Sequence, residues 1–104
     1  FILPKQVFML ELRPVCENCG NPLPPNSTEA MICSFECTFC ITCVTDILQN
    51  VCPNCGGGFV QRPVRPVAEL EKYPATTKMV LKPVNMAVFA ALLERYRLVE
   101  ANLR

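Results

Sequence analysis

Apolar side chains recur at helical spacing near the C-terminal end of the chain. In residues 84–104 they stand three or four positions apart, so they share one face of a helix. Asn85 comes just before the first of them and has a side chain suited to capping a helix. The apolar residues are Met86, Phe89, Leu92, Leu93, Tyr96, Val99 and Leu103. The spacing predicts an amphipathic helix whose apolar face covers either its own domain or another protein.

The segments before it predict shorter elements. Residues 1–15 contain β-prone residues in partial alternation, which favours an extended segment. The MICSFEC stretch, residues 31–37, indicates a short strand or one arm of a β-hairpin. The VTDILQN stretch, residues 44–50, predicts a helix of about two turns, with Thr42 as a possible N-cap.

Prolines dominate residues 58–83. The RPVRPV sequence begins at residue 62, and further prolines stand at positions 74 and 83. Because proline interrupts helices and sheet ladders, we expect an extended strap here. Only AELEKY, residues 68–73, indicates a single helical turn.

Eight cysteines lie between Cys16 and Cys55, and the chain contains no histidine. A segment of about 40 residues buries too little apolar surface to fold without disulfides, metal ions or association. The apolar stretch FILPKQVFML has neither a basic lead-in nor a small-residue cleavage site, so it makes a poor signal peptide. We therefore expect a cytoplasmic, reducing location, where paired cysteines more often hold metal than form disulfides.

Charge and hydropathy narrow the class of function. The 10 basic and 9 acidic residues nearly balance, and no Lys or Arg lies between residues 16 and 61, so nucleic-acid binding is not expected. No apolar run reaches the roughly 18 residues of a membrane span. Histidine is absent and four carboxylates of the cysteine-rich segment have no visible partner, so a nucleophile and base cannot be paired and no enzyme is expected. Those carboxylates are Glu17, Glu29, Glu36 and Asp46.

Two further residue types have expected places. We expect the phenylalanines of the cysteine-rich segment to fill the core between two metal sites, and they are Phe35, Phe39 and Phe59. Arg62 and Arg65 belong to the predicted strap, where we expect them to be solvated.

The cysteines form four close pairs: Cys16/Cys19, Cys33/Cys37, Cys40/Cys43 and Cys52/Cys55. A C-x2-C turn directs two sulfurs to one point, and two pairs complete the tetrahedron that Zn²⁺ prefers. Eight ligands make two closed sites with no open coordination position, which is typical of structural metal. In CENCG and CPNCG the glycine permits positive φ, so backbone N–H groups turn toward the sulfurs. Zinc is favoured and iron is the alternative; spacing alone leaves three pairings open.

The order of the pairs and the gaps between them resemble the RING finger, with Cys37 standing where that family has histidine. Phe39 before the fifth ligand, a short helix after the sixth, and Pro53 inside the last pair match it further. The resemblance implies one site of Cys16, Cys19, Cys40 and Cys43, and a second of Cys33, Cys37, Cys52 and Cys55. An alternative similar to rubredoxins and zinc ribbons pairs Cys16/Cys19 with Cys52/Cys55.

RING fingers that act as ubiquitin ligases dock a conjugating enzyme, and the resemblance locates the equivalent surface. The positions are Asn18, Ile47, Pro53 and Gly56. Ile47 and Pro53 match the family's pattern. Asn18 replaces an apolar residue and Gly56 replaces a basic one, which weakens the case for a ligase.

A closer resemblance is to a family of small bacterial cysteine-rich proteins of uncharacterised function. It rests on MLELRP (9–14), LPP (23–25), ICSFECTFC (32–40), CPNCGG (52–57) and RPVRP (62–66), and it covers roughly residues 9–75. This resemblance implies metal binding and a bacterial origin, and it supplies no activity.

Together these patterns predict a small metal-stabilised α+β fold. An extended segment (1–15) precedes a RING-like cross-brace module (16–57) with two zinc ions, a short β-hairpin and one short helix. The strap (58–83) and the amphipathic helix (84–104) follow. We expect a structural zinc module that mediates protein–protein interaction without catalysis. The alternatives are a ubiquitin-ligase-like scaffold and an iron, redox or metal-buffer protein of rubredoxin-like chemistry. A protein partner or a second copy would bind the helix face at Phe89, Leu92, Leu93, Tyr96 and Val99.

Overall fold

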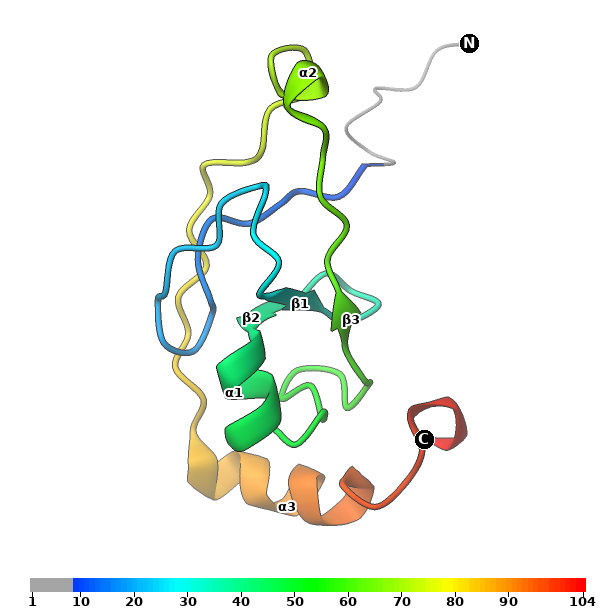
Figure 1. Ribbon diagram of the computed structural model, residues 1–104. Helices are drawn as coiled ribbons and strands as arrows, with labels where there is room; N and C mark the ends of the chain where they lie inside the picture. The colour runs from blue at the N-terminus through cyan, green and yellow to red at the C-terminus, as the bar shows by residue number, and fades with distance from the viewer. Residues whose placement is uncertain (1–8) are drawn as a thin grey trace, which may run out of the picture.

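The computed structural model describes residues 9–104, and the part of the predicted extended segment in residues 1–8 lies outside them. Figure 1 shows a small sheet and a short helix at the centre, with a second helix below them. A long irregular segment joins the upper part of the molecule to that second helix. The expected α+β class is confirmed by this combination of helices with an antiparallel sheet.

The sheet has three short antiparallel strands in the order β2-β1-β3. The predicted hairpin consists of β1 (Ala30–Ile32) and β2 (Thr38–Cys40), which pair with Ala30 opposite Cys40. The third strand, β3 (Val60–Gln61), pairs with β1 and was expected to be part of the strap. Local sequence does not reveal these two residues as a strand, because they pair with a strand almost 30 positions earlier.

The first helix, α1 (Ile41–Asp46), follows β2 without a loop. It begins at Ile41 with Cys40 as its N-cap residue, so the expected cap at Thr42 is wrong. It begins three residues before the predicted segment VTDILQN and ends four residues before that segment does. The chain leaves the helix through Gln49 and Asn50, whose φ angles of 49° and 60° are left-handed and end helical bonding.

Residues 9–14 form no strand, in contrast to the alternation of VFMLELR. Leu12 has a φ of 58°, which breaks an extended run, and Val15 makes only an isolated bridge to Pro22. Carbonyls in this segment are used by distant residues instead: the Thr76 N–H donates to Glu11 O at 2.8 Å.

The strap is extended apart from one helical turn, α2 (Val67–Leu70), at the upper end of Figure 1. From there it runs down one side of the molecule, beside the blue N-terminal segment, to the lower helix. The Lys82 N–H donates to Glu17 O at 2.7 Å, which fixes the lower part of the strap to the first cysteine pair.

The lower helix, α3 (Met86–Tyr96), begins as predicted. Asn85 Oδ1 accepts hydrogen bonds from Ala87 N at 3.1 Å and Val88 N at 3.3 Å. The helix ends at Tyr96 instead of continuing to Leu103, and a 3-10 turn, η2 (Ala101–Leu103), follows.

The core lies between β2, α1 and the segment before β3. Phe39 and Phe59 meet edge to face with ring centroids 5.5 Å apart, and Leu23, Leu48 and Val51 are buried beside them. Phe35, expected in this core, is 71 % exposed because it sits at the tip of the β1–β2 turn.

Arg62 is the largest fully buried side chain of the described residues, although a solvated position was expected. Its guanidinium donates to the carbonyls of Arg13, Leu23 and Pro24 at 2.9–3.0 Å. Burial lowers its pKa. These bonds hold the loop before β1 against the end of β3. Among residues 9–104 no helix has the length and apolar character needed to cross a membrane.

Candidate metal centres

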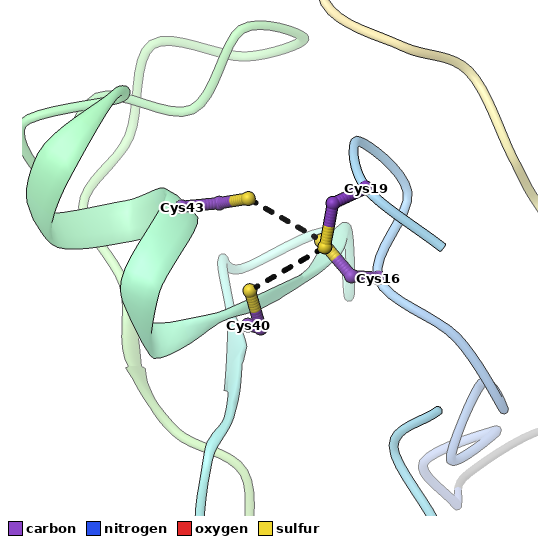
Figure 2. A group of neighbouring side chains, drawn as sticks. All are labelled: Cys16, Cys19, Cys40 and Cys43. Atoms are coloured by element: carbon purple, nitrogen blue, oxygen red, sulfur yellow. Dashed lines mark hydrogen bonds between the residues drawn. The ribbon is translucent and has the colours of Figure 1, made fainter. Parts of the chain in front are cut away.

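The first cysteine cluster consists of Cys16, Cys19, Cys40 and Cys43, whose sulfurs all lie within 4.8 Å of one another. Figure 2 shows the four side chains pointing toward one another, two from the β2–α1 junction and two from the facing loop. The Sγ atoms of Cys16 and Cys43 are 3.8 Å apart, and those of Cys19 and Cys40 are 3.7 Å apart. A tetrahedron with metal–sulfur bonds of about 2.3 Å has edges of about 3.8 Å. The sulfur spacing therefore fits a tetrahedral metal ion.

Local structure explains how each half of this cluster forms. Cys40 ends β2 and Cys43 lies in the first turn of α1, so one strand–helix junction supplies both sulfurs. On the other side, the Gly20 N–H donates to Cys16 O at 2.9 Å and closes a tight turn. Gly20 has a φ of 76°, a left-handed value that costs a residue with a Cβ about 1–2 kcal/mol.

The second cysteine cluster contains Cys33, Cys37 and Cys52, with sulfurs within 4.8 Å of one another. Cys55 is exposed and falls outside that mutual distance, but its side chain lies near Cys33 and acts to lower the pKa of that thiol. The four cysteines Cys33, Cys37, Cys52 and Cys55 could hold a second ion, for which the Cys55 side chain supplies the outermost ligand.

The last cysteine pair repeats the backbone geometry of the first. The Gly56 N–H donates to Cys52 O at 2.8 Å, and the Cys52 N–H donates to Gly57 O at 2.8 Å. Gly56 has a φ of 78°, almost the same as Gly20. We call residues 16–21 the first knuckle and residues 52–57 the last knuckle. The glycines in CENCG and CPNCG therefore have the positive φ expected from the sequence.

The two clusters combine the first cysteine pair with the third, and the second with the fourth. This grouping is the one that the RING resemblance implied. The rubredoxin-like alternative, with Cys16/Cys19 beside Cys52/Cys55, is not the arrangement in the structure. Metal identity does not follow from the grouping, because zinc and iron both accept four thiolates.

Both knuckles also share an asparagine, because each reads C-x-N-C-G. The Asn18 side chain donates to Cys43 Sγ at 3.4 Å. The Asn54 side chain lies near Cys37 and acts to lower the pKa of its thiol. Each asparagine thus reaches a sulfur of the opposite pair in its own cluster. Such outer partners orient metal ligands and strengthen metal binding.

The electrostatics of the first cluster favour a cation among the sulfurs. Burial acts to raise the pKa of Cys16, but backbone hydrogen bonds from Cys19, Cys40 and Asn18 outweigh it and lower that pKa. Burial raises the pKa values of Cys40 and Cys43, and the charge of Cys16 raises them further. Four sulfurs this close ionise together only when a positive ion compensates their charge.

In the second cluster, too, one cysteine pKa is lowered while the pKa values of buried neighbours are raised. Burial again acts to raise the pKa of Cys33, but backbone hydrogen bonds, led by the one from Phe35, outweigh it and lower that pKa. The Phe35 N–H lies 3.4 Å from Cys33 Sγ. Burial raises the pKa values of Cys37 and Cys52, and the charge of Cys33 adds to both. Each cluster therefore contains a thiol with a lowered pKa beside buried thiols with raised pKa values, whose ionisation a cation would favour.

Two carboxylates expected to be unpaired support this framework. Glu17 is buried and accepts hydrogen bonds from Thr38 N at 2.6 Å and from Arg13 Nη1 at 2.9 Å. These contacts join the first knuckle to β2, which ends in Cys40. The Glu36 carboxylate accepts a hydrogen bond from the Glu11 N–H at 2.8 Å. The φ of Glu36 is 63°, which is left-handed, and the residue lies in the turn between β1 and β2. Neither carboxylate points to acid–base chemistry.

The helix face proposed for a partner is instead used within the chain. Phe89 is buried, and Leu92, Leu93 and Tyr96 pack against the core cluster. Val99 is half-buried beyond the helix end. The face was correctly identified as apolar, but its occupant in the structure is the cysteine module, because a core of this size leaves apolar surface to cover.

Comparison with known proteins agrees with the bacterial resemblance. Residues 9–65 match the family described as a protein of unknown function (DUF1272). An uncharacterised protein from Rhizobium meliloti (strain 1021) is 60 % identical over 79 residues, which cover 76 % of this chain and 94 % of that protein. No solved structure shows significant similarity to the chain. The chain therefore belongs to the DUF1272 family of small cysteine-rich bacterial proteins.

Proposed function

We propose that the protein is a structural zinc module that holds two Zn²⁺ ions and mediates protein–protein interaction without catalysis of its own. The observation that carries this proposal is the convergence of sulfurs from distant segments at tetrahedral spacing. The first cluster joins residues 27 positions apart at 3.8 Å. A reducing compartment such as the cytoplasm suits these ligands, since every cysteine is a free thiol.

The ligand set supports a structural role for the ions. Four thiolates fill a tetrahedral coordination sphere, so no position remains for a water or a substrate. When bound, each ion supplies a fixed cross-link between segments. The chain's own residues supply the rest: Asn18 and Asn54 orient sulfurs, and the knuckle glycines allow the turns.

Phe35 offers a surface for the interaction. Its side chain is 71 % exposed at the tip of the turn between Cys33 and Cys37. The turn is held by the Glu36 N–H, which donates to Cys33 O at 3.0 Å. An exposed aromatic side chain on a turn fixed by two ligands binds a partner with little loss of conformational entropy.

Zinc is preferred to iron because a site with no chemistry to perform needs no redox-active ion. The rubredoxin-like alternative also loses support from the grouping of the cysteines, which joins the first pair to the third.

The ligase-like alternative is weakened by the C-terminal segment. The Asn18 side chain accepts the Val84 N–H at 2.9 Å, and an added Cβ at Gly56 would lie 2.9 Å from Tyr96. Two of the four positions of the conjugating-enzyme surface are therefore covered by the strap and α3.

Native mass spectrometry of the untagged protein tests the metal part. We expect two zinc ions per chain, and one in a variant carrying both Cys16→Ser and Cys19→Ser. Disulfide-linked protein without metal, or iron with visible thiolate absorption, would contradict the proposal. The interaction part fails if Phe35→Ser, with both ions retained, leaves the set of proteins cross-linked in the source cell unchanged.

A further inference from the structure

The Asn18 side chain lies between the first cysteine cluster and the strap. Its Nδ2 donates to Cys43 Sγ at 3.4 Å, and its Oδ1 accepts from Val84 N at 2.9 Å. The same amide group therefore donates to the Cys43 sulfur and accepts a hydrogen bond from a backbone N–H 66 positions later in the chain. Reversing the amide would break both bonds at once.

The strap bond of Asn18 lies at the start of α3. Val84 immediately precedes Asn85, whose side chain caps the helix. Two further contacts hold the same part of the strap on the first knuckle: the Lys82 N–H donates to Glu17 O at 2.7 Å, and Leu81 reaches within 3.6 Å of the Cβ position of Gly20. These contacts therefore hold the start of α3 against the first knuckle.

The packing of α3 beyond this point is incomplete. Phe89 is buried, yet a pocket of about 240 Å³, partly open to solvent, separates the helix from the last knuckle, lined by Pro53, Val84, Phe89 and Leu92 among others. Side chains that border this pocket make fewer dispersion contacts on that side. Hydrogen bonds at the start of α3 therefore matter more for its docking than they would on a fully packed interface.

We propose that Asn18 is a positioning residue that couples metal binding at the first cluster to the docking of α3. The inference rests on the proposed metal binding and adds a regulatory step to it. A bound ion fixes the Cys43 side chain, which anchors the Asn18 donor and aims its acceptor at Val84. Loss of the ion frees this amide, and α3 undocks with its apolar face exposed. Coupling is reciprocal, so a docked α3 retains the ion by the same factor.

Two substitutions separate the two bonds of the amide. Asn18→Asp keeps an acceptor for the Val84 N–H and removes the donor to sulfur. Val84→Pro removes the N–H and leaves the contact between Asn18 and Cys43 intact. Chelator titration followed by native mass spectrometry counts the retained ions, alkylation identifies the released cysteines, and hydrogen exchange reports on residues 86–96.

We expect both variants to release metal from the first cluster about tenfold more readily than the wild type, in line with the usual effect of losing a partner of a metal ligand. We also expect faster exchange in residues 86–96 in both. The informative result is Val84→Pro, which leaves both members of the Asn18–Cys43 hydrogen bond in place. The double variant should be little worse than Asn18→Asp alone, because that substitution already removes the coupling.

Asn54→Asp is the matched control. Asn54 occupies the same place in the last knuckle and contacts Cys37, but no hydrogen bond joins its side chain to the strap among the described residues. It should weaken metal retention at the second cluster and leave the first unchanged. The inference is overturned if Val84→Pro loosens α3 while the first cluster keeps wild-type retention. Failure of the wild-type protein to bind any metal would instead refute the proposed function.

Discussion

Gly20 and Gly56 show how one residue type can be required for two different reasons. Both have φ angles near 77°, which L-residues rarely adopt. Around Gly20 the nearest atom to an added Cβ is Leu81 Cδ1 at 3.6 Å, an ordinary contact. Around Gly56 the ring of Tyr96 lies at 2.9 Å. The φ requirement follows from the C-x-x-C-G motif, whereas the steric one arises only because α3 docks on the last knuckle.

We therefore predict different costs for the two alanine substitutions. Gly20→Ala should lower the free energy of unfolding by about 1–2 kcal/mol, the cost of a left-handed residue with a Cβ. Gly56→Ala should cost roughly 1–3 kcal/mol more, the usual effect of overpacking. Denaturant unfolding of the metal-loaded protein measures both. Adding Tyr96→Ala to Gly56→Ala should remove most of the excess, and equal costs for the two glycines would contradict the docking of α3 on the last knuckle.

Arg62 shows the opposite case, in which the sequence carried no usable signal. Its neighbours are prolines and valines, which suggested a solvated strap. The carbonyls that it binds belong to Arg13, Leu23 and Pro24, between 38 and 49 positions earlier. A buried guanidinium needs such acceptors, and acceptors supplied by a distant irregular loop cannot be read from local sequence.

At the scale of elements, α3 began where its local sequence indicated and ended where distant contacts required. The Asn85 cap acts on residues two and three positions later, so sequence alone revealed it. No proline or glycine follows Tyr96 to stop the helix. Instead Arg104 donates to Asn50 O at 2.7 Å and to Gly56 O at 3.1 Å, which draws the last residues back to the last knuckle.

The docking of α3 gives a prediction with an internal control. Phe89 is 3 % exposed and Val88, its neighbour, is 72 % exposed. Phe89→Ala should lower the free energy of unfolding by about 3–5 kcal/mol, since it empties a buried position. Val88→Ala should change that free energy by less than about 0.5 kcal/mol, as expected at the surface. Urea unfolding followed by circular dichroism compares them. Similar effects of both variants would show that α3 does not pack through Phe89.

At the scale of the whole molecule, the elements are too small to account for a stable fold. The strands have 3, 3 and 2 residues, and α1 has 6. The buried side chains form one cluster that includes six of the eight cysteines, and the molecule extends 42 × 31 × 19 Å. Cross-links between distant segments must supply what apolar burial does not.

Removal of both ions should therefore unfold the whole chain. The free energy of metal binding contributes directly to folding, so a strong chelator should remove the dispersion of the amide signals of the metal-loaded protein. Zinc in excess of the chelator should restore it, whereas magnesium, which prefers oxygen ligands, should not. The measurement is a two-dimensional amide NMR spectrum at each step. Dispersed signals that persist after complete demetallation would show that the fold does not depend on the ions.

The sequence by itself determined the features that depend on a few neighbouring residues: the tight turns of the two knuckles, the hairpin, the extended strap and the start of α3. Turn and cap geometry follows from residues within about five positions of one another. Only the tertiary structure decided which cysteines share a cluster, that β3 joins the sheet, and that the apolar face of α3 covers its own module. It also placed Phe35 at the surface and Arg62 in the interior. These outcomes depend on which segments come together although they are tens of residues apart in the chain. Local sequence does not specify such long-range contacts.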